Sequence, residues 1–165
     1  IYLLEALDEV WKSHPTVRLC FIGRIGWLPR ETLERIKNHP AYGTTFFVFT
    51  TLSDTELSYC YQHAKALLYA SHAEGFGLPV VEALEHGLPV LASDIPIHRE
   101  VGGPFCAYFD LSDPQSLAQM INALEKGREM DVQDAGEFRP TPWEEACRQM
   151  LSRSLDLAQA APSLQ

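Results

Sequence analysis

Short apolar segments alternate with amphipathic ones along most of this chain, and this alternation constrains the fold more than any other feature. Apolar runs of strand composition occur at residues 17–22, 45–50, 66–70, 89–92 and 106–109. Helical periodicity or helix-start signals predict helices at 1–13, 30–38, 53–64, 79–86 and 113–127, and from about residue 142. Strands that are apolar throughout are typical of parallel sheets covered by helices. We therefore predict the α/β class, with a doubly wound parallel sheet and helices on both faces.

Length and composition predict a single domain over residues 1–165. The chain has 165 residues, of which 46% are hydrophobic and 21% charged, as in ordinary globular proteins. Residues 128–165 are expected to form an irregular segment followed by a C-terminal helix. The first residue, Ile1, already lies inside an apolar-periodic run. We therefore expect the chain to be a fragment of a longer protein.

The charge balance excludes several classes of partner. The net charge is −9 and the pI about 5.0, which argues against nucleic acid and against an anionic membrane surface. No run of 18 apolar residues is present, so no membrane contact is expected from this piece. The four cysteines are scattered without a C-x-x-C pair, and no signal peptide is visible. A cytoplasmic location with reduced cysteines is the expectation.

The segment 71–94 contains the most informative motif. Glu74 and Glu82 stand with seven residues between them, around a Gly-Phe-Gly turn and a proline at the expected start of a helix. A loop that opens onto a helix N-terminus offers unpaired N–H groups and a positive dipole end, which suit phosphate. Because carboxylates repel phosphate, the two acids are expected to accept hydrogen bonds from neutral hydroxyls. The motif therefore predicts a pocket for a nucleotide-linked sugar at the carboxyl edge of the sheet.

The sequence of this segment closely resembles that of the C-terminal, donor-binding domain of family 4 retaining glycosyltransferases of the GT-B fold. The resemblance rests on Glu-Gly-Phe-Gly-Leu-Pro-Val-Val-Glu, followed by Ala-Leu-Glu-His-Gly-Leu-Pro-Val-Leu-Ala-Ser-Asp. His14-Pro15, Leu52–Leu57 and Phe138–Glu145 also fall where that family has similar elements. The resemblance covers nearly all of the chain, so we expect a Rossmann-like half of a GT-B fold.

The resemblance implies a role for each part of the motif. Glu74 takes the catalytic position and contacts hydroxyls of the transferred sugar, while Glu82 holds the ribose hydroxyls. The backbone N–H groups surround the sugar donor: those of Gly75, Phe76 and Gly77 at the sugar, and those of Leu78 and Val80 at the diphosphate. Alternatively, Glu82 is a first-turn acid that complements the helix dipole, and Glu74 is a solvated loop acid.

Other candidate residues lie outside the motif. The nucleobase is expected over neighbouring strand ends, at Gly23, Phe49, Thr50 and Thr51. In the resembling family an Arg and a Lys after the first strand bind the phosphates. That strand, that Lys and the acceptor domain are expected to precede this chain, which leaves Arg24 as the nearest substitute or a surface residue.

Two histidines near the motif are further candidates for acid–base roles. His72 precedes the Gly-Phe-Gly turn, and His98 is expected in the loop after the next strand. A structural or surface role is favoured over catalysis for both.

The resemblance implies a hexosyltransferase that transfers a sugar, with retention, from a nucleotide-diphosphate sugar to a glycan or glycolipid acceptor in polysaccharide biosynthesis. No Asp-x-Asp motif is present, so no metal is expected. The sugar donor is the only small molecule implied. The sequence of residues 93–100 slightly favours GDP-mannose as that donor. The isolated chain is expected to bind a sugar donor weakly and to be inactive, because the acceptor would be bound by a missing domain. The alternatives are a degenerate, non-catalytic module and a GT-B sugar-nucleotide epimerase.

Overall fold

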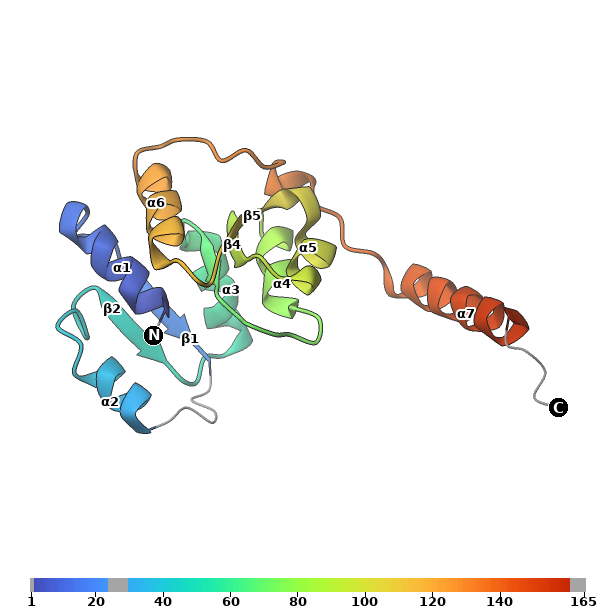
Figure 1. Ribbon diagram of the computed structural model, residues 1–165, viewed down its shortest axis with the longest axis horizontal. Helices are drawn as coiled ribbons and strands as arrows, with labels where there is room; N and C mark the ends of the chain where they lie inside the picture. The colour runs from blue at the N-terminus through green and yellow to red at the C-terminus, as the bar shows by residue number, and fades with distance from the viewer. Residues whose placement is uncertain (1, 24–29, 161–165) are drawn as a thin grey trace.

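The computed structural model describes residues 2–23 and 30–160, and helices and strands alternate along this part of the chain (Figure 1). The strands are β1 (Leu19–Ile22), β2 (Phe46–Phe49), β3 (Leu67–Tyr69), β4 (Val90–Ser93) and β5 (Cys106–Phe109). The helices are α1 (Tyr2–Ser13), α2 (Arg30–Lys37), α3 (Asp54–His63), α4 (Leu78–Glu85), α5 (Pro96–Gly102), α6 (Pro114–Glu125) and α7 (Trp143–Ala160). Short 3₁₀ turns follow α5 (Gly103–Phe105) and precede α7 (Ala135–Glu137).

All strand pairs are parallel, as predicted, but the strands form two sheets. One sheet pairs β1 with β2 over four residues, from Leu19 opposite Phe46 to Ile22 opposite Phe49. The other has the order β3-β4-β5, with β4 in the centre. The burial of β4 agrees with that position, because all four of its residues are buried. The predicted α/β class is therefore confirmed, and the structure adds a division of the sheet between β1 and β3.

Two apolar clusters hold the layers together. In the first, α1 packs beside α6 over β5, and Leu4, Leu7 and Val10 are fully buried against Phe109 and Leu117. In the second, α4 packs on β3 and β4, and α5 packs beside α4. Burying a leucine side chain contributes about 1.5–3 kcal/mol, so the leucines of α1 fix this helix firmly on the sheet.

Local signals explain where individual helices begin and end. Ser53 caps α3: its hydroxyl accepts from the Glu56 N–H, while the Glu56 carboxylate accepts from the Ser53 N–H at 2.8 Å. This is the capping box that the sequence predicts. Gly87 follows α4 with φ of +69°, as expected for a residue that ends a helix.

The structure adds one helix that the sequence analysis did not predict. α5 occupies Pro96–Gly102, where a loop was expected. Its seven residues are too few to show helical periodicity, and Pro96 at its start is equally typical of a turn. His98, expected in a loop, is therefore a buried helical residue.

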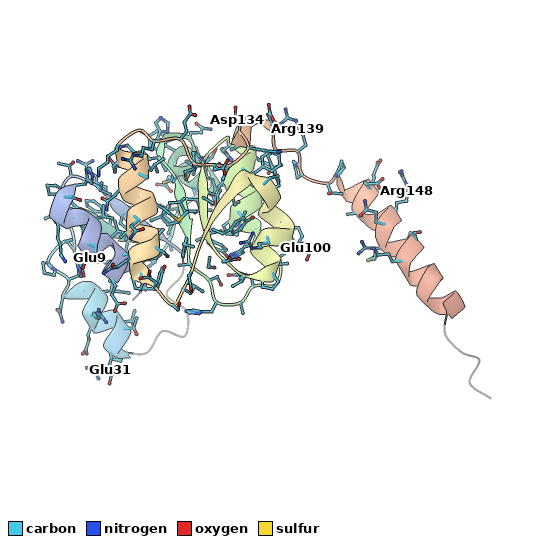
Figure 2. The ribbon with its side chains drawn as sticks, turned by 45° about the horizontal axis from the view of Figure 1, so that its top comes forward. Glu9, Glu31, Glu100, Asp134, Arg139 and Arg148 are labelled. Carbon is cyan, nitrogen blue, oxygen red and sulfur yellow. The ribbon has the colours of Figure 1, made fainter. Side chains whose placement is uncertain are left out.

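Charged side chains cover the outside of these layers. Figure 2 shows the exposed Glu9, Glu31, Glu100, Asp134 and Arg148 on different elements, while α7 stands apart from the rest. Within residues 2–23 and 30–160, no helix combines the length and apolar character needed to cross a membrane.

Candidate functional site

The predicted loop connects β3 to the N-terminus of α4. Residues 72–76 are exposed, and Gly77 occupies the N-cap position of α4 with φ of +81° and ψ of +44°. This left-handed conformation is costly for any residue with a Cβ, which explains a glycine at this point. Gly77 has no side chain to cap the helix, so the first N–H groups of α4 receive no side-chain partner.

Each acid of the motif is held by a tyrosine hydroxyl. Tyr69, at the end of β3, donates to Glu74 Oε1 at 2.9 Å, and Tyr61, on α3, donates to Glu82 Oε2 at 2.9 Å. Burial, and then the hydrogen bond to its acid, raises the pKa of each tyrosine well above its ordinary value. The charge of Glu82 also raises the pKa of Tyr69, so Tyr69 links the two acid–tyrosine pairs. We call them the acid–tyrosine cluster.

This arrangement leaves part of each carboxylate available to a ligand. One oxygen of each acid is bound by a phenol, and the other, Glu74 Oε2 or Glu82 Oε1, has no hydrogen bond within the described part of the chain. Glu74 is exposed and Glu82 is half-buried. An ionised carboxylate is purely an acceptor, so the available oxygens suit hydroxyl groups.

The N–H groups of Leu78 and Val80 are both predicted to face a diphosphate, but only one of them is free of a hydrogen bond to the described residues. The Val80 N–H donates to Gly77 O at 2.9 Å, and Val80 is fully buried. The Leu78 N–H makes no hydrogen bond to any described residue, and the Leu78 side chain is 59% exposed. An anion at the start of α4 would therefore meet the Leu78 N–H first, and it would reach the Val80 N–H only by displacing an internal bond.

His98 packs against the loop between β3 and α4. Its Nδ1 lies 3.0 Å from Ser93 O, and the Ser93 hydroxyl donates to Ser71 O at the start of the loop. Because a carbonyl only accepts, Nδ1 carries the proton, and Nε2 of a neutral imidazole is then an acceptor. Nε2 is buried without a hydrogen-bond partner, and a Cβ on Gly77 would lie 3.5 Å from the ring carbon Cδ2. His98 thus packs beneath Gly77, which agrees with the structural role favoured from the sequence, whereas His72 is exposed.

The nucleobase candidates lie at the ends of the other sheet. The Gly23 N–H donates to Phe49 O at 3.0 Å, which joins the carboxyl ends of β1 and β2. Phe49 is 41% exposed, and Thr50 and Thr51 are exposed as well. No hydrogen bond or ring contact joins these described residues to the acid–tyrosine cluster. Arg24 lies outside the described residues.

Arg99 carries a positive charge at the carboxyl edge of the β3-β4-β5 sheet, the edge from which the loop to α4 also leaves. Arg99 pairs with Asp94, just after β4, with Nη2 at 2.7 Å from Oδ2, and its guanidinium lies 4.6 Å from the centre of the Tyr108 ring. This ion pair lowers the pKa of Asp94. Over the described residues, no group of three or more His, Cys, Asp or Glu side chains is placed to hold a metal ion.

Sequence reasoning missed the tyrosines of this cluster. Tyr69 could have been found, because it lies near the end of the strand predicted at 66–70, only five residues before Glu74. Tyr61 gave no signal, because it reaches Glu82 across 21 residues of sequence and from another helix.

The parallel α/β layers and the loop between β3 and α4 define the Rossmann-like half of a GT-B glycosyltransferase. A solved structure supports this class: a glycosyltransferase involved in avilamycin A biosynthesis superposes with a TM-score of 0.55 at 16% identity, covering 94% of this chain and 48% of that one. Residues 1–135 match the family described as Glycosyl transferases group 1, and the chain belongs to that family.

Named proteins of similar sequence are sugar transferases by their names, in agreement with this family. The serotype-specific mannosyltransferase WbdA of Escherichia coli is 33% identical over 118 residues, which are 72% of this chain and 14% of that protein. The O-antigen chain mannosyltransferase RfbU of Salmonella typhimurium is 39% identical over 75 residues, 46% of this chain and 21% of that protein. The sulfoquinovosyl transferase SQD2 of Arabidopsis thaliana is 38% identical over 92 residues, 54% of this chain and 16% of that protein. The chain therefore spans only a small part of these relatives, and the resemblance found in the sequence is confirmed at the level of the family and fold.

Proposed function

We propose that this chain is the donor-binding domain of a retaining glycosyltransferase that takes a hexose from a nucleotide-diphosphate sugar and transfers it to a glycan or glycolipid acceptor. The observation that carries the proposal is the acid–tyrosine cluster beside the N-terminus of α4. It combines two carboxylates, each with one oxygen that no described residue binds, with the N–H of Leu78 at the helix start, which donates to none of the described residues. Hydroxyl acceptors next to an anion site match the chemistry of a sugar linked to a diphosphate.

Each part of the site has a role in this proposal. Glu74 accepts a hydroxyl of the transferred sugar through Oε2, while Tyr69 fixes the carboxylate through Oε1. Glu82 holds the ribose hydroxyls in the same way, with Tyr61 as its support. The diphosphate lies at the start of α4, where the Leu78 N–H and the helix dipole stabilise its charge.

In the proposed reaction, the bond between the sugar C1 and the diphosphate oxygen breaks, and the diphosphate leaves with the electron pair. An acceptor hydroxyl forms the new bond to C1 on the same face, through an oxocarbenium-like state, and its proton passes to the departing diphosphate. The charge that develops on the leaving group is the main demand on the protein, and the Leu78 N–H together with the N-terminal end of the α4 dipole meets it. No metal or further cofactor is part of this proposal.

The relatives support one sugar above others. WbdA and RfbU are both named as mannosyltransferases, and the name of RfbU refers to the O-antigen chain. We therefore favour mannose from GDP-mannose as the transferred group and a bacterial surface polysaccharide as the product.

A panel of nucleotide sugars tests the proposal. Differential scanning fluorimetry of the whole protein against GDP-mannose, UDP-glucose, UDP-N-acetylglucosamine and dTDP-rhamnose should give the largest rise in Tm with GDP-mannose, because ligands stabilise the state that binds them. Glu74→Gln should lower the turnover of GDP-mannose about 100-fold. Glu85→Gln, on the exposed side of the same helix, is the matched control and should leave turnover unchanged. A change in the configuration of the nucleotide sugar without any acceptor would instead identify an epimerase, and binding without turnover a degenerate module.

A further inference from the structure

The imidazole of His86, the residue that caps the end of α4, connects this helix to α3. Its Nδ1 lies 2.8 Å from Glu82 O, and its Nε2 lies 3.1 Å from the Ser58 hydroxyl oxygen on α3. A carbonyl oxygen only accepts, so Nδ1 carries the proton and Nε2 of the neutral ring accepts. The Ser58 hydroxyl therefore donates to His86. The side-chain amide of Gln62 donates to the same hydroxyl oxygen at 3.2 Å, which leaves the hydroxyl proton for the histidine.

Two hydrogen bonds join α3 to α4 and its cap within the described part of the chain, and both hold Glu82. Tyr61 binds the Glu82 carboxylate directly. Ser58 binds His86, which in turn holds the Glu82 carbonyl. The two residues on α3 are three positions apart and the two on α4 are four, so each pair lies on one face of its helix. Glu82 is thereby fixed at its side chain and at its main chain from the same neighbouring helix.

The bond between Tyr61 and Glu82 depends on how α3 is oriented against α4. Tyr61 is only 9% exposed, and within the described residues its hydroxyl donates to Glu82 Oε2 alone. A buried hydroxyl is costly to leave unpaired, so the phenol has to stay within reach of this oxygen. The bond from Ser58 to His86 lies about one helical turn away and opposes rotation of α3 about its axis. The rings of Tyr61 and His86 also pack together, with 5.2 Å between their centroids.

We propose that His86 is a positioning residue for ribose binding, which fixes α3 against the end of α4 so that Tyr61 holds Glu82 Oε2 and Glu82 Oε1 faces the hydroxyls of the nucleotide. This role rests on the proposed function, because it requires that Glu82 holds the ribose. His86 itself does not touch the ligand. The Leu78 N–H lies at the opposite end of α4. A change at His86 should therefore alter the recognition of ribose hydroxyls and leave the diphosphate contact as it is.

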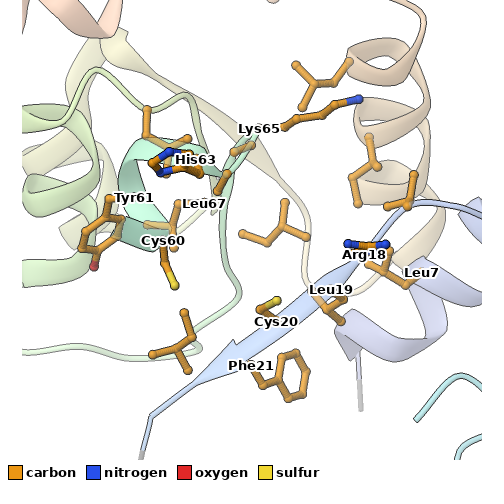
Figure 3. A pocket seen from close by; sticks show the side chains of 18 of the residues that line it. Leu7, Arg18, Leu19, Cys20, Phe21, Cys60, Tyr61, His63, Lys65 and Leu67 are labelled. Carbon is orange, nitrogen blue, oxygen red and sulfur yellow. The ribbon is translucent and has the colours of Figure 1, made fainter. Parts of the chain in front are cut away.

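His63 is a matched control, because it makes the same local contact without the bond to a second helix. Its Nδ1 lies 2.9 Å from Tyr59 O, four residues earlier and at the end of α3, and its side chain is exposed, as that of His86 is. No hydrogen bond joins His63 to another helix among the residues that the structure describes. Figure 3 shows His63 and Tyr61 on α3, where both line the neighbouring pocket. Replacing His63 therefore measures what the loss of a histidine at a helix end costs in itself.

Calorimetric titration of the whole protein with GDP and with 2′,3′-dideoxy-GDP tests this proposal. The second nucleotide lacks both ribose hydroxyls, so the ratio of the two Kd values measures what Glu82 contributes through them. The parent protein should bind GDP at least about tenfold more tightly. His86→Ala and Ser58→Ala should each lower this ratio about three- to tenfold, whereas His63→Ala should leave it unchanged. His86→Gln should retain most of the ratio, because glutamine Oε1 accepts from Ser58 in place of Nε2.

The affinity for 2′,3′-dideoxy-GDP separates positioning from a general loss of structure. It should change less than about twofold in every variant, because this nucleotide does not use the ribose contact. An unchanged ratio in both His86→Ala and Ser58→Ala would overturn the proposal and leave the ribose role of Glu82 in place. Equal weakening of both nucleotides would also overturn it, because His86 would then support the site as a whole. A parent protein that binds neither nucleotide, or binds both equally, would contradict the ribose role of Glu82 itself and overturn this inference with it.

Discussion

The left-handed conformation of Gly77 gives the sharpest prediction for the loop before α4. Gly77 has φ of +81°, whereas Gly75, two residues earlier, has no such conformation, and a Cβ there meets no atom within 4 Å. A left-handed conformation costs an L-residue about 1–2 kcal/mol. Replacing glycine by alanine also lowers the entropy of the unfolded chain, which contributes about 0.4–1 kcal/mol to stability in both variants. The unfolding free energy of Gly77→Ala should therefore lie about 1–2 kcal/mol below that of Gly75→Ala.

The cost at Gly77 arises from the backbone and not from a clash. A Cβ at this position would lie 3.5 Å from His98 Cδ2, which is ordinary van der Waals contact. Urea unfolding followed by circular dichroism measures the difference. With an m-value of about 2 kcal/mol/M, the midpoints of the two variants should differ by about 0.5–1 M. Equal midpoints, or a lower midpoint for Gly75→Ala, would refute the reasoning.

Three further predictions concern stability. His98→Ala should lower the free energy of unfolding by about 2–4 kcal/mol, because it leaves a cavity and removes the hydrogen bonds that His98 Nδ1 makes within the core. The exposed His72→Ala should change it by less than about 0.5 kcal/mol, and equal effects in urea unfolding would contradict the packing of His98 under the loop. Ser53→Ala should cost about 1 kcal/mol through loss of the capping box, and an unchanged urea midpoint would contradict that. Burial raises the pKa of the Cys106 thiol to about 12. Because the folded pKa lies above the unfolded value, this contribution to stability is complete below about pH 9 and is lost between about pH 9 and 12, so Cys106→Ala should unfold with a weaker alkaline dependence than the parent chain.

The sequence predicted the elements whose signals are local. The apolar runs at 45–50 and 106–109 and the capping box at Ser53 specify their structures through neighbouring residues, and the structure contains all three. The loop before α4 was predictable for the same reason, because Gly77 and Pro79 act within one turn of the helix start.

Features that depend on distant residues could not be predicted in this way. The pairing of Tyr61 with Glu82 requires two helices to be packed together first. The helix α5 has seven residues, and its stability comes from burying His98 and Gly102 and not from its own periodicity. The division of the sheet depends on which strand edges meet, which alternation along the chain does not specify.

Calorimetric titration with GDP and GDP-mannose tests the central claim most directly. The chain should bind GDP-mannose, Glu82→Ala should weaken that binding at least about tenfold through loss of the ribose contact, and Glu85→Ala, an exposed acid on the same helix, should bind as the parent chain does. Circular dichroism of each variant verifies that the fold is retained. Absence of any nucleotide binding, or equal affinities for Glu82→Ala and Glu85→Ala, would contradict the assignment of this site.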